Sequence, residues 1–143
     1  MSEDLQDLDG WITDTIETLS PASRAKLLRR MGPVLRRNLQ KRLSAQVGPD
    51  GKRWAARKDG SRRKMMRGLR LGRHLKIRSD SDRIRMGWRG RTGGIARVHH
   101  YGLRDRIRKK GIRVKYEQRE LLGLSRTDTE AVSNQVTDWL TDS

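Results

Sequence analysis

The first 19 residues carry apolar side chains at every third or fourth position, the spacing of one face of an α-helix. Most acidic residues of this segment lie between them, so it predicts an amphipathic helix with an acidic outer face. The acids also suit the positive N-terminal end of the helix dipole. The apolar positions are Leu5, Leu8, Ile12, Ile16 and Leu19.

A second, longer helix is predicted to begin after Ser20, because serine is a favoured N-cap and proline, here Pro21, suits the first helical position. Gly32 and Pro33 interrupt it, and an internal proline removes one backbone donor. We therefore expect a kink or a short break in this basic helix. Its apolar stripe consists of Leu27, Leu28, Met31, Val34, Leu35, Leu39 and Leu43.

The segment after this helix is expected to be less regular. Residues 48–51 read Gly-Pro-Asp-Gly, a strong turn signal, and the polar, basic segment that follows predicts a loop. Residues 63–71 predict a short helix that places three apolar side chains against the core. These side chains are Met65, Met66 and Leu69.

Strand patterns follow in two places. Apolar and basic residues alternate over 75–78 and 83–88, and the turn residues 79–82 between them predict a hairpin with one apolar and one basic face. Residues 112–116 alternate in the same way and predict a third strand. The segment 103–111 before it predicts a basic loop.

Two further helices are predicted in the second half of the chain. Residues 95–101 have helical spacing, and Gly102 would end that helix. Ser125 and Asp128 have the spacing of a capping box for a last helix. Its buried stripe is expected to consist of Val132, Val136, Trp139 and Leu140.

Together these elements predict an α+β fold in a single domain over residues 1–143. It comprises an amphipathic N-terminal helix, a long basic helix, a small antiparallel sheet with a hairpin, and a C-terminal helix. A hydrophobic content of 33% leaves only a modest core, which argues against a large enzyme with a deep cleft. The acidic segment 1–19 is a candidate docking arm.

The formal charge of +17 is unevenly distributed. Residues 1–20 hold six acids and no Lys or Arg, whereas residues 21–119 hold 33 of the 34 basic residues. The basic side chains in the middle of the chain repel one another unless their charge is neutralised. We therefore expect this segment to contact phosphate or an acidic protein surface. The acidic ends are themselves candidate partners, within one chain or between copies. The alternative is a solvated face that only keeps the protein soluble.

Composition also limits where the protein works. Cysteine is absent, which excludes disulfides and thiolate metal sites. No apolar run approaches the roughly 20 residues of a membrane span, and the N-terminus is acidic where a signal peptide is basic. We expect a cytosolic product without membrane contact that leaves the cytosol only as part of a larger particle.

The sequence offers no constellation for catalysis or for a metal or cofactor. His99 and His100 are adjacent, so on a helix they point about 100° apart and cannot chelate one ion as an i,i+4 pair could. We interpret them as packing or interface residues. Asp80 and Asp82 lie in a predicted turn, where local hydrogen bonds account for them. No P-loop or nucleophile-elbow motif occurs.

Nucleic-acid binding is the main alternative to a structural role. Basic residues cluster over 62–73 and in the predicted loop 103–111, and either group can neutralise phosphates without sequence preference. However, no zinc-finger or RRM signature is present, and aromatic residues that could stack on bases are few. A nuclease is a distant third hypothesis, because no catalytic constellation supports it.

Three motifs stand out along the chain. Residues 49–57 read Pro-Asp-Gly-x-x-Trp-x-x-Arg, and Lys64-Met65 and Leu69-Arg70 follow. Residues 95–106 read Ile-Ala-Arg-Val-His-His-Tyr-Gly-Leu-Arg-Asp-Arg, and residues 116–124 read Tyr-x-x-Arg-Glu-Leu-Leu-Gly-Leu. Over roughly residues 20–140 the chain thereby resembles the phage virion morphogenesis family, the tail-completion proteins of contractile-tailed phages.

The resemblance implies a structural virion protein, not an enzyme, that completes the head-proximal end of the tail and takes part in head–tail joining. It also implies a homo-oligomeric ring, expected to be a hexamer, that contacts tail-tube, sheath and connector proteins. Non-specific contact with genomic DNA is a further expectation. The protein would be found in the tail or neck of the virion, and in the host cytoplasm during assembly.

Two roles are open for the blocks 95–106 and 116–124: joints between copies in a ring, or core turns of the monomer. Trp54 likewise either caps the core or anchors a partner. Arg97 and Arg119 are the expected ion-pair formers. The candidate interface or phosphate-contact residues are Arg62, Arg63, Lys64, Arg67, Arg97, His99, Tyr101, Arg104, Arg106, Arg108, Lys109, Lys110 and Arg119.

Overall fold

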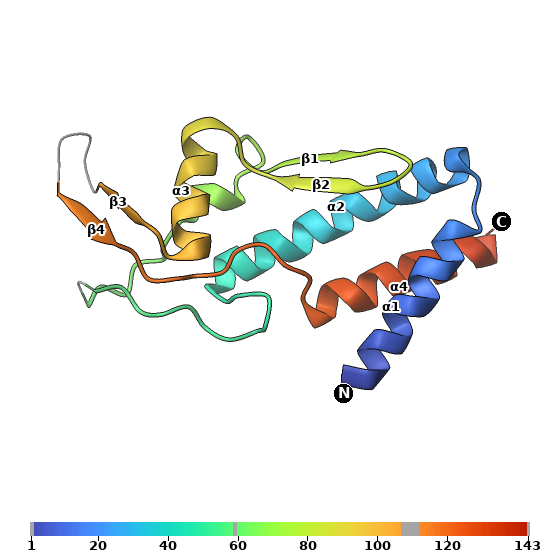
Figure 1. The fold of residues 1–143 in the computed structure, drawn as a ribbon, viewed down its shortest axis with the longest axis horizontal. Helices are drawn as coiled ribbons and strands as arrows, with labels where there is room; N and C mark the ends of the chain where they lie inside the picture. The colour runs from blue at the N-terminus through green and yellow to red at the C-terminus, as the bar shows by residue number, and fades with distance from the viewer. Residues whose placement is uncertain (1, 59, 107–111, 143) are drawn as a thin grey trace. The chain divides into compact units, whose positions relative to one another are not determined.

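The computed structural model describes residues 2–58, 60–106 and 112–142, and within these ranges it has an α+β fold (Figure 1). The α+β prediction is confirmed. In chain order the elements are α1 (Ser2–Glu17), α2 (Pro21–Ala45), the 3-10 helix η1 (Arg67–Arg70), β1 (Lys76–Ser79), β2 (Ile84–Gly87), α3 (Gly90–Tyr101), β3 (Arg104–Arg106), β4 (Arg113–Lys115) and α4 (Arg126–Asp142). The strands form two separate two-stranded sheets, β1–β2 and β3–β4.

The chain divides into two compact units. Unit 1 comprises Met1–Asn38, Ile77–Met86 and Arg126–Ser143, and unit 2 comprises Leu39–Lys76 and Gly87–Ser125. Helix α2 and the β1–β2 hairpin contribute residues to both units.

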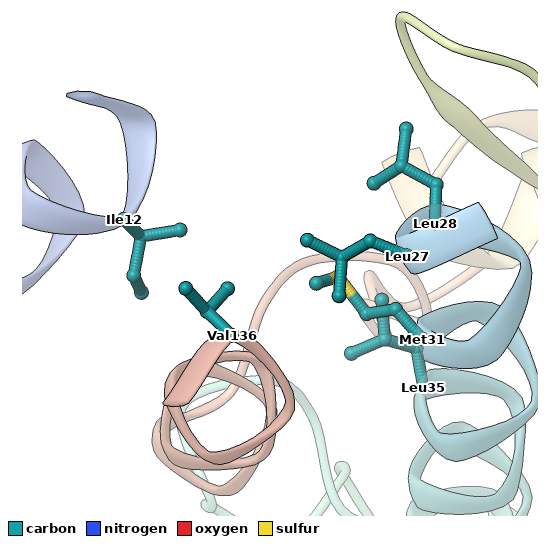
Figure 2. Packing of buried hydrophobic residues seen from close by; sticks show 6 residues of the cluster. All are labelled: Ile12, Leu27, Leu28, Met31, Leu35 and Val136. Atoms are coloured by element: carbon teal, nitrogen blue, oxygen red, sulfur yellow. The ribbon is translucent and has the colours of Figure 1, made fainter. Parts of the chain in front are cut away.

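The core of unit 1 lies where α1, α4 and the first half of α2 meet. Ile12 of α1 and Val136 of α4 point toward one another in Figure 2, with leucines of α2 beside them. The hairpin contributes Ile84 and Met86 to the edge of this cluster. Its buried members are Ile12, Leu27, Leu28, Met31, Leu35 and Val136, so parts of the apolar stripes predicted for the three helices meet in this core, whereas Leu39 and Leu43 of the α2 stripe belong to unit 2.

Helix α2 begins where the sequence predicts. The Ser20 hydroxyl accepts a hydrogen bond from the Ser23 N–H at 3.2 Å, which confirms the N-cap. Of the kink or short break predicted at Gly32-Pro33, the break is wrong, because α2 runs through Pro33 as one helix. Proline has no N–H, so the carbonyl one helical turn before Pro33 lacks its usual donor. Because Pro33 is exposed, water can bond that carbonyl instead. Gly32 instead admits the hairpin, since a Cβ there would lie 2.7 Å from Ile77 Cδ1.

The predicted hairpin and last helix are present in unit 1. In the turn between β1 and β2, the Asp80 carboxylate accepts the backbone N–H groups of Asp82 and Arg83 at 2.7 and 2.9 Å. These two hydrogen bonds lower the pKa of Asp80, as expected for a turn residue. Helix α4 begins directly after Ser125, but its buried stripe ends at Trp139. The prediction that Leu140 is buried is wrong: it lies one residue further round the helix and is 45% exposed.

Unit 2 is built from shorter elements around the second half of α2. Two predictions fail here. The helix expected over 63–71 is only the 3-10 turn η1, because the Gln46 side chain bonds both the N–H and the C=O of Met65 (2.6 and 3.0 Å). The start of the predicted loop 103–111 is strand β3, which pairs with β4. The buried apolar residues of unit 2 are Leu39, Leu43, Leu69, Leu75, Ala96 and Leu121.

Within the described residues, no helix has both the length and the apolar character needed to cross a membrane.

Candidate functional site

Three segments that are distant in sequence meet in unit 2: residues 47–56, 98–103 and 116–123. We call this meeting place the joint. It joins parts of all three sequence motifs, and hydrogen bonds and close backbone contacts connect the segments. The contacts within the joint therefore bear on whether those motif residues stabilise the monomer, form contacts between copies, or do both.

Arg119 is the centre of the joint. Its side chain is buried, with a residue exposure of 6%. The guanidinium donates from Nε to the Ala55 carbonyl and from Nη2 to the Ala56 carbonyl, both at 3.0 Å. Its backbone N–H donates to the His99 carbonyl at 2.7 Å. Burial lowers the pKa of Arg119, and nearby Glu117 partly offsets this. One arginine thus ties together all three segments.

The Pro-Asp-Gly turn packs on the end of the third segment. Trp54 is half-buried and donates its indole N–H to the Glu120 carbonyl at 3.0 Å. Gly123 has a φ of +142°, and a Cβ there would lie 2.8 Å from Pro49 Cγ. The polar atom of Trp54 is therefore bonded within the chain, which favours the interpretation that Trp54 caps the core.

Gly102 lets α3 end against the third segment. It has a φ of +66°, and a Cβ there would lie 3.0 Å from both the backbone N and the Cβ of Gln118. The next residue, Leu103, donates its N–H to the Val98 carbonyl and accepts from Tyr116. Glycine is required here both for the left-handed conformation and for the close approach.

The two histidines have different structural roles. His100 Nδ1 accepts the Leu121 N–H at 3.1 Å, so this ring fixes the third segment. The half-buried His99 ring meets Tyr116 edge-on at 5.0 Å between ring centres, and its buried Nδ1 has no hydrogen-bond partner among the described residues. Burial, and secondarily the charge of Arg119, lower the pKa of His99. Among residues 2–58, 60–106 and 112–142, no group of three or more His, Asp and Glu side chains could hold a metal ion.

His99 predicts that acid destabilises the joint. Its folded-state pKa lies below the ordinary 6.5, so between the two values the unfolded chain binds more protons. The His99 contribution is present above about pH 6.5 and is lost as the pH falls through the lowered value. For one proton the effect cannot exceed about 1.4 kcal/mol per pH unit. Thermal unfolding between about pH 7.5 and 5.5 should show a loss of Tm that is smaller in His99→Phe. An unchanged pH dependence in that variant would contradict the assignment to His99.

A pocket of about 580 Å³ lies beside the joint, within unit 2. The cationic side chains Arg57, Lys58 and Lys115 line it, together with Arg119. Apolar surface comes from Met65, Met66, Val114 and Tyr116, and His99 and Glu117 complete the lining. The pocket thus combines positive charge with an apolar lining.

The predicted contact residues do not form one cluster. His99 and Arg119 lie in the joint, where the Arg119 guanidinium donates to the carbonyls of Ala55 and Ala56. The exposed residues are Arg62, Arg63, Lys64 and Arg67 before and within η1, Arg97 and Tyr101 on α3, and Arg104 on β3. Arg106 lies in β3, and Arg108, Lys109 and Lys110 fall outside the described residues.

The prediction named His99 and Arg119 of the pocket lining but missed the cationic residues Arg57, Lys58 and Lys115. Arg57 belongs to the first motif, which was a usable signal. Lys58 and Lys115 carry no local signal, because they are separated by 57 residues and come together only through the fold, where Lys58 Nζ donates to the Lys115 carbonyl at 3.4 Å.

The chain belongs to the phage virion morphogenesis family, whose model matches residues 3–141. The resemblance found in the motifs is therefore confirmed. Tail completion protein S of Escherichia phage P2 is 35% identical to the chain over 130 residues, which cover 85% of this chain and 87% of that protein. No solved structure matches the chain.

Proposed function

We propose that the protein is a structural component of a phage virion that completes the head-proximal end of the tail and takes part in head–tail joining. The observation that carries this is the extent of the similarity. The family match spans residues 3–141, and the P2 relative, named a tail completion protein, is matched over 87% of its length. The match includes both units, which supports treating the chain as one functional domain.

The protein acts as a homo-oligomeric ring, for which we expect six copies, and contacts the tail tube, sheath and connector. It resides in the tail or neck of the virion after assembly in the host cytoplasm. Its role is not enzymatic. Support comes from the joint, where His100, one of the two histidines first considered for chemistry, accepts the backbone N–H of Leu121 and so binds the third segment.

The test is loss and return of the gene in the phage that encodes the protein. Without it, filled heads and tails that lack a completed head-proximal end should accumulate unjoined, and the wild-type gene should restore joined particles that contain the chain. As a control, a gene that carries Gly94→Ala, a substitution at an open position on α3, should restore joined particles as well as the wild-type gene does. Joined, infectious particles that lack the chain would reject the proposal.

Sequence-independent binding of nucleic acid is the second candidate. It is favoured by the charge of unit 2, whose sequence ranges 39–76 and 87–125 hold 24 Lys and Arg against five Asp and Glu. Affinity for duplex DNA should be measured across salt concentrations, because phosphate-driven binding falls steeply with salt. Tight binding that survives moderate salt would favour this candidate over incidental contact.

A further inference from the structure

The two units differ sharply in charge. Unit 2 has a net formal charge of +19, whereas unit 1 has ten Lys and Arg against twelve Asp and Glu, a net charge of −2. The acids of unit 1 are concentrated in α1 and α4, which together carry ten acids and a single base, Arg126. The acidic ends of the sequence thus meet in the fold, because α1 packs along α4 (Figure 1). We call these two helices the acidic helix pair.

The acidic helix pair also exposes an aromatic side chain. Trp11 of α1 is 42% exposed, although its neighbour Ile12 is buried in the core. Asp14, three residues along the same helix and therefore on the same side, is also exposed. Exposed tryptophans are frequent anchors of protein interfaces, where they enter a pocket and are surrounded by weaker contacts.

The pocket of unit 2 has the complementary chemistry. The side chains of Lys58 and Lys115 are exposed at its edge, and the half-buried Met65 and Met66 supply apolar surface. A large apolar side chain flanked by carboxylates would bury its ring against the methionines and place its acids near the lysines. A nucleic-acid phosphate would use the lysines but would leave the apolar lining uncovered.

We propose that the acidic helix pair of one copy docks on the pocket of a second copy, with Trp11 as the anchor. The proposal rests on the homo-oligomeric assembly inferred above and names the surfaces that build it. The contact joins two different patches of the same chain, so it is heterologous, and repetition of such a contact gives a ring when its rotation closes. Complementary charge would also steer the copies into register.

The experiment uses the full-length protein, freed of nucleic acid, and measures its mass by sedimentation over a range of concentrations and salt. The wild type should self-associate, and more weakly at high salt. Two variants each reverse two charges on one surface: Lys58→Glu/Lys115→Glu in the pocket and Asp14→Lys/Glu17→Lys on the helix beside Trp11. Each alone, and Trp11→Ala, should self-associate at least about tenfold more weakly.

Mixing provides the decisive result. The two variants should bind each other, because the lysines introduced at positions 14 and 17 of one then face the glutamates introduced at positions 58 and 115 of the other. Arg73→Glu/Arg89→Glu makes the same change in charge at exposed positions that do not line the pocket, and it should assemble like the wild type. Circular dichroism of each variant verifies that it is folded.

Three outcomes would overturn the docking proposal. The wild type could stay monomeric, Lys58→Glu/Lys115→Glu could associate as strongly as the wild type, or the two variants could fail to bind each other when mixed. Docking of the acidic pair within its own chain would give the first of these. A monomeric protein that still restores tail joining in the phage would reject this interface and its ring, and would leave the proposed role in tail joining standing. Particles that join without the protein would reject the function itself.

Discussion

Replacing Arg119 with alanine is expected to lower the free energy of unfolding by roughly 3 kcal/mol. A hydrogen bond from a charged group contributes about 1.5–3 kcal/mol, and Arg119 donates two from its guanidinium. Ala55 and Ala56 are exposed, so water can replace part of what their carbonyls lose, and the expected value lies at the low end of the sum. Urea unfolding with an unchanged slope measures the difference.

Two variants make the Arg119 prediction specific. Arg119→Lys retains the charge but presents a single point donor, so it should recover only part of the loss. Arg97→Ala removes an exposed arginine from α3 and should change stability by no more than about 0.5 kcal/mol. If Arg119→Ala were as stable as Arg97→Ala, Arg119 would not be the tie that holds the three segments together.

Gly102→Val is expected to be as costly, again roughly 3 kcal/mol or more. The left-handed conformation costs a residue with a Cβ about 1–2 kcal/mol, and more for a β-branched side chain. The new Cβ would also lie 3.0 Å from the backbone N of Gln118, and overpacking of this kind costs about 1–3 kcal/mol. Chemical unfolding should show the lower free energy of unfolding. Amide hydrogen exchange should become faster first in β4 and in the third segment of the joint.

Gly94→Ala provides the matched control on the same helix. Gly94 lacks a positive φ, and nothing lies within 4 Å of the position where a Cβ would be built. Alanine is the better helix former, so this variant should be stabilised by up to about 1 kcal/mol. Equal effects at the two glycines would show that α3 does not end against Gln118 as described.

Helices were the part of the fold that periodicity predicted best. Apolar spacing located α1, α2 and α4, each of which buries apolar side chains of its predicted stripe, and Ser20 marked the start of α2 through a bond between neighbours in sequence. Such signals are local. The break expected at Pro33 failed because the cost of an internal proline depends on exposure, which sequence does not reveal.

The remaining errors come from long-range contacts. Strand β3 reads Arg-Asp-Arg, so it lacks an apolar alternation and exists because β4 lies beside it. The helix expected over 63–71 lost its first turn to the side chain of Gln46, from a residue 19 positions away. Neither contact leaves a periodic signal in the segment that it changes.

For the site, the sequence supplied the motifs but not their arrangement. His99, Trp54 and Arg119 were all singled out, yet only the fold shows that they belong to one joint. The blocks 95–106 and 116–124 therefore at least connect parts of the monomer core. We now propose contacts between copies, the other role left open for them, at the pocket and the acidic helix pair. Those surfaces combine residues from opposite ends of the chain or from segments far apart in it.

An electron-microscopy map of the head-proximal end of the assembled tail tests the proposed role most directly. We expect a closed ring of copies of this chain at that end, with the α1–α4 pair of each copy seated at Arg57, Lys58 and Lys115 of its neighbour. A map of mature, joined particles in which no density fits the chain would contradict the role in tail completion.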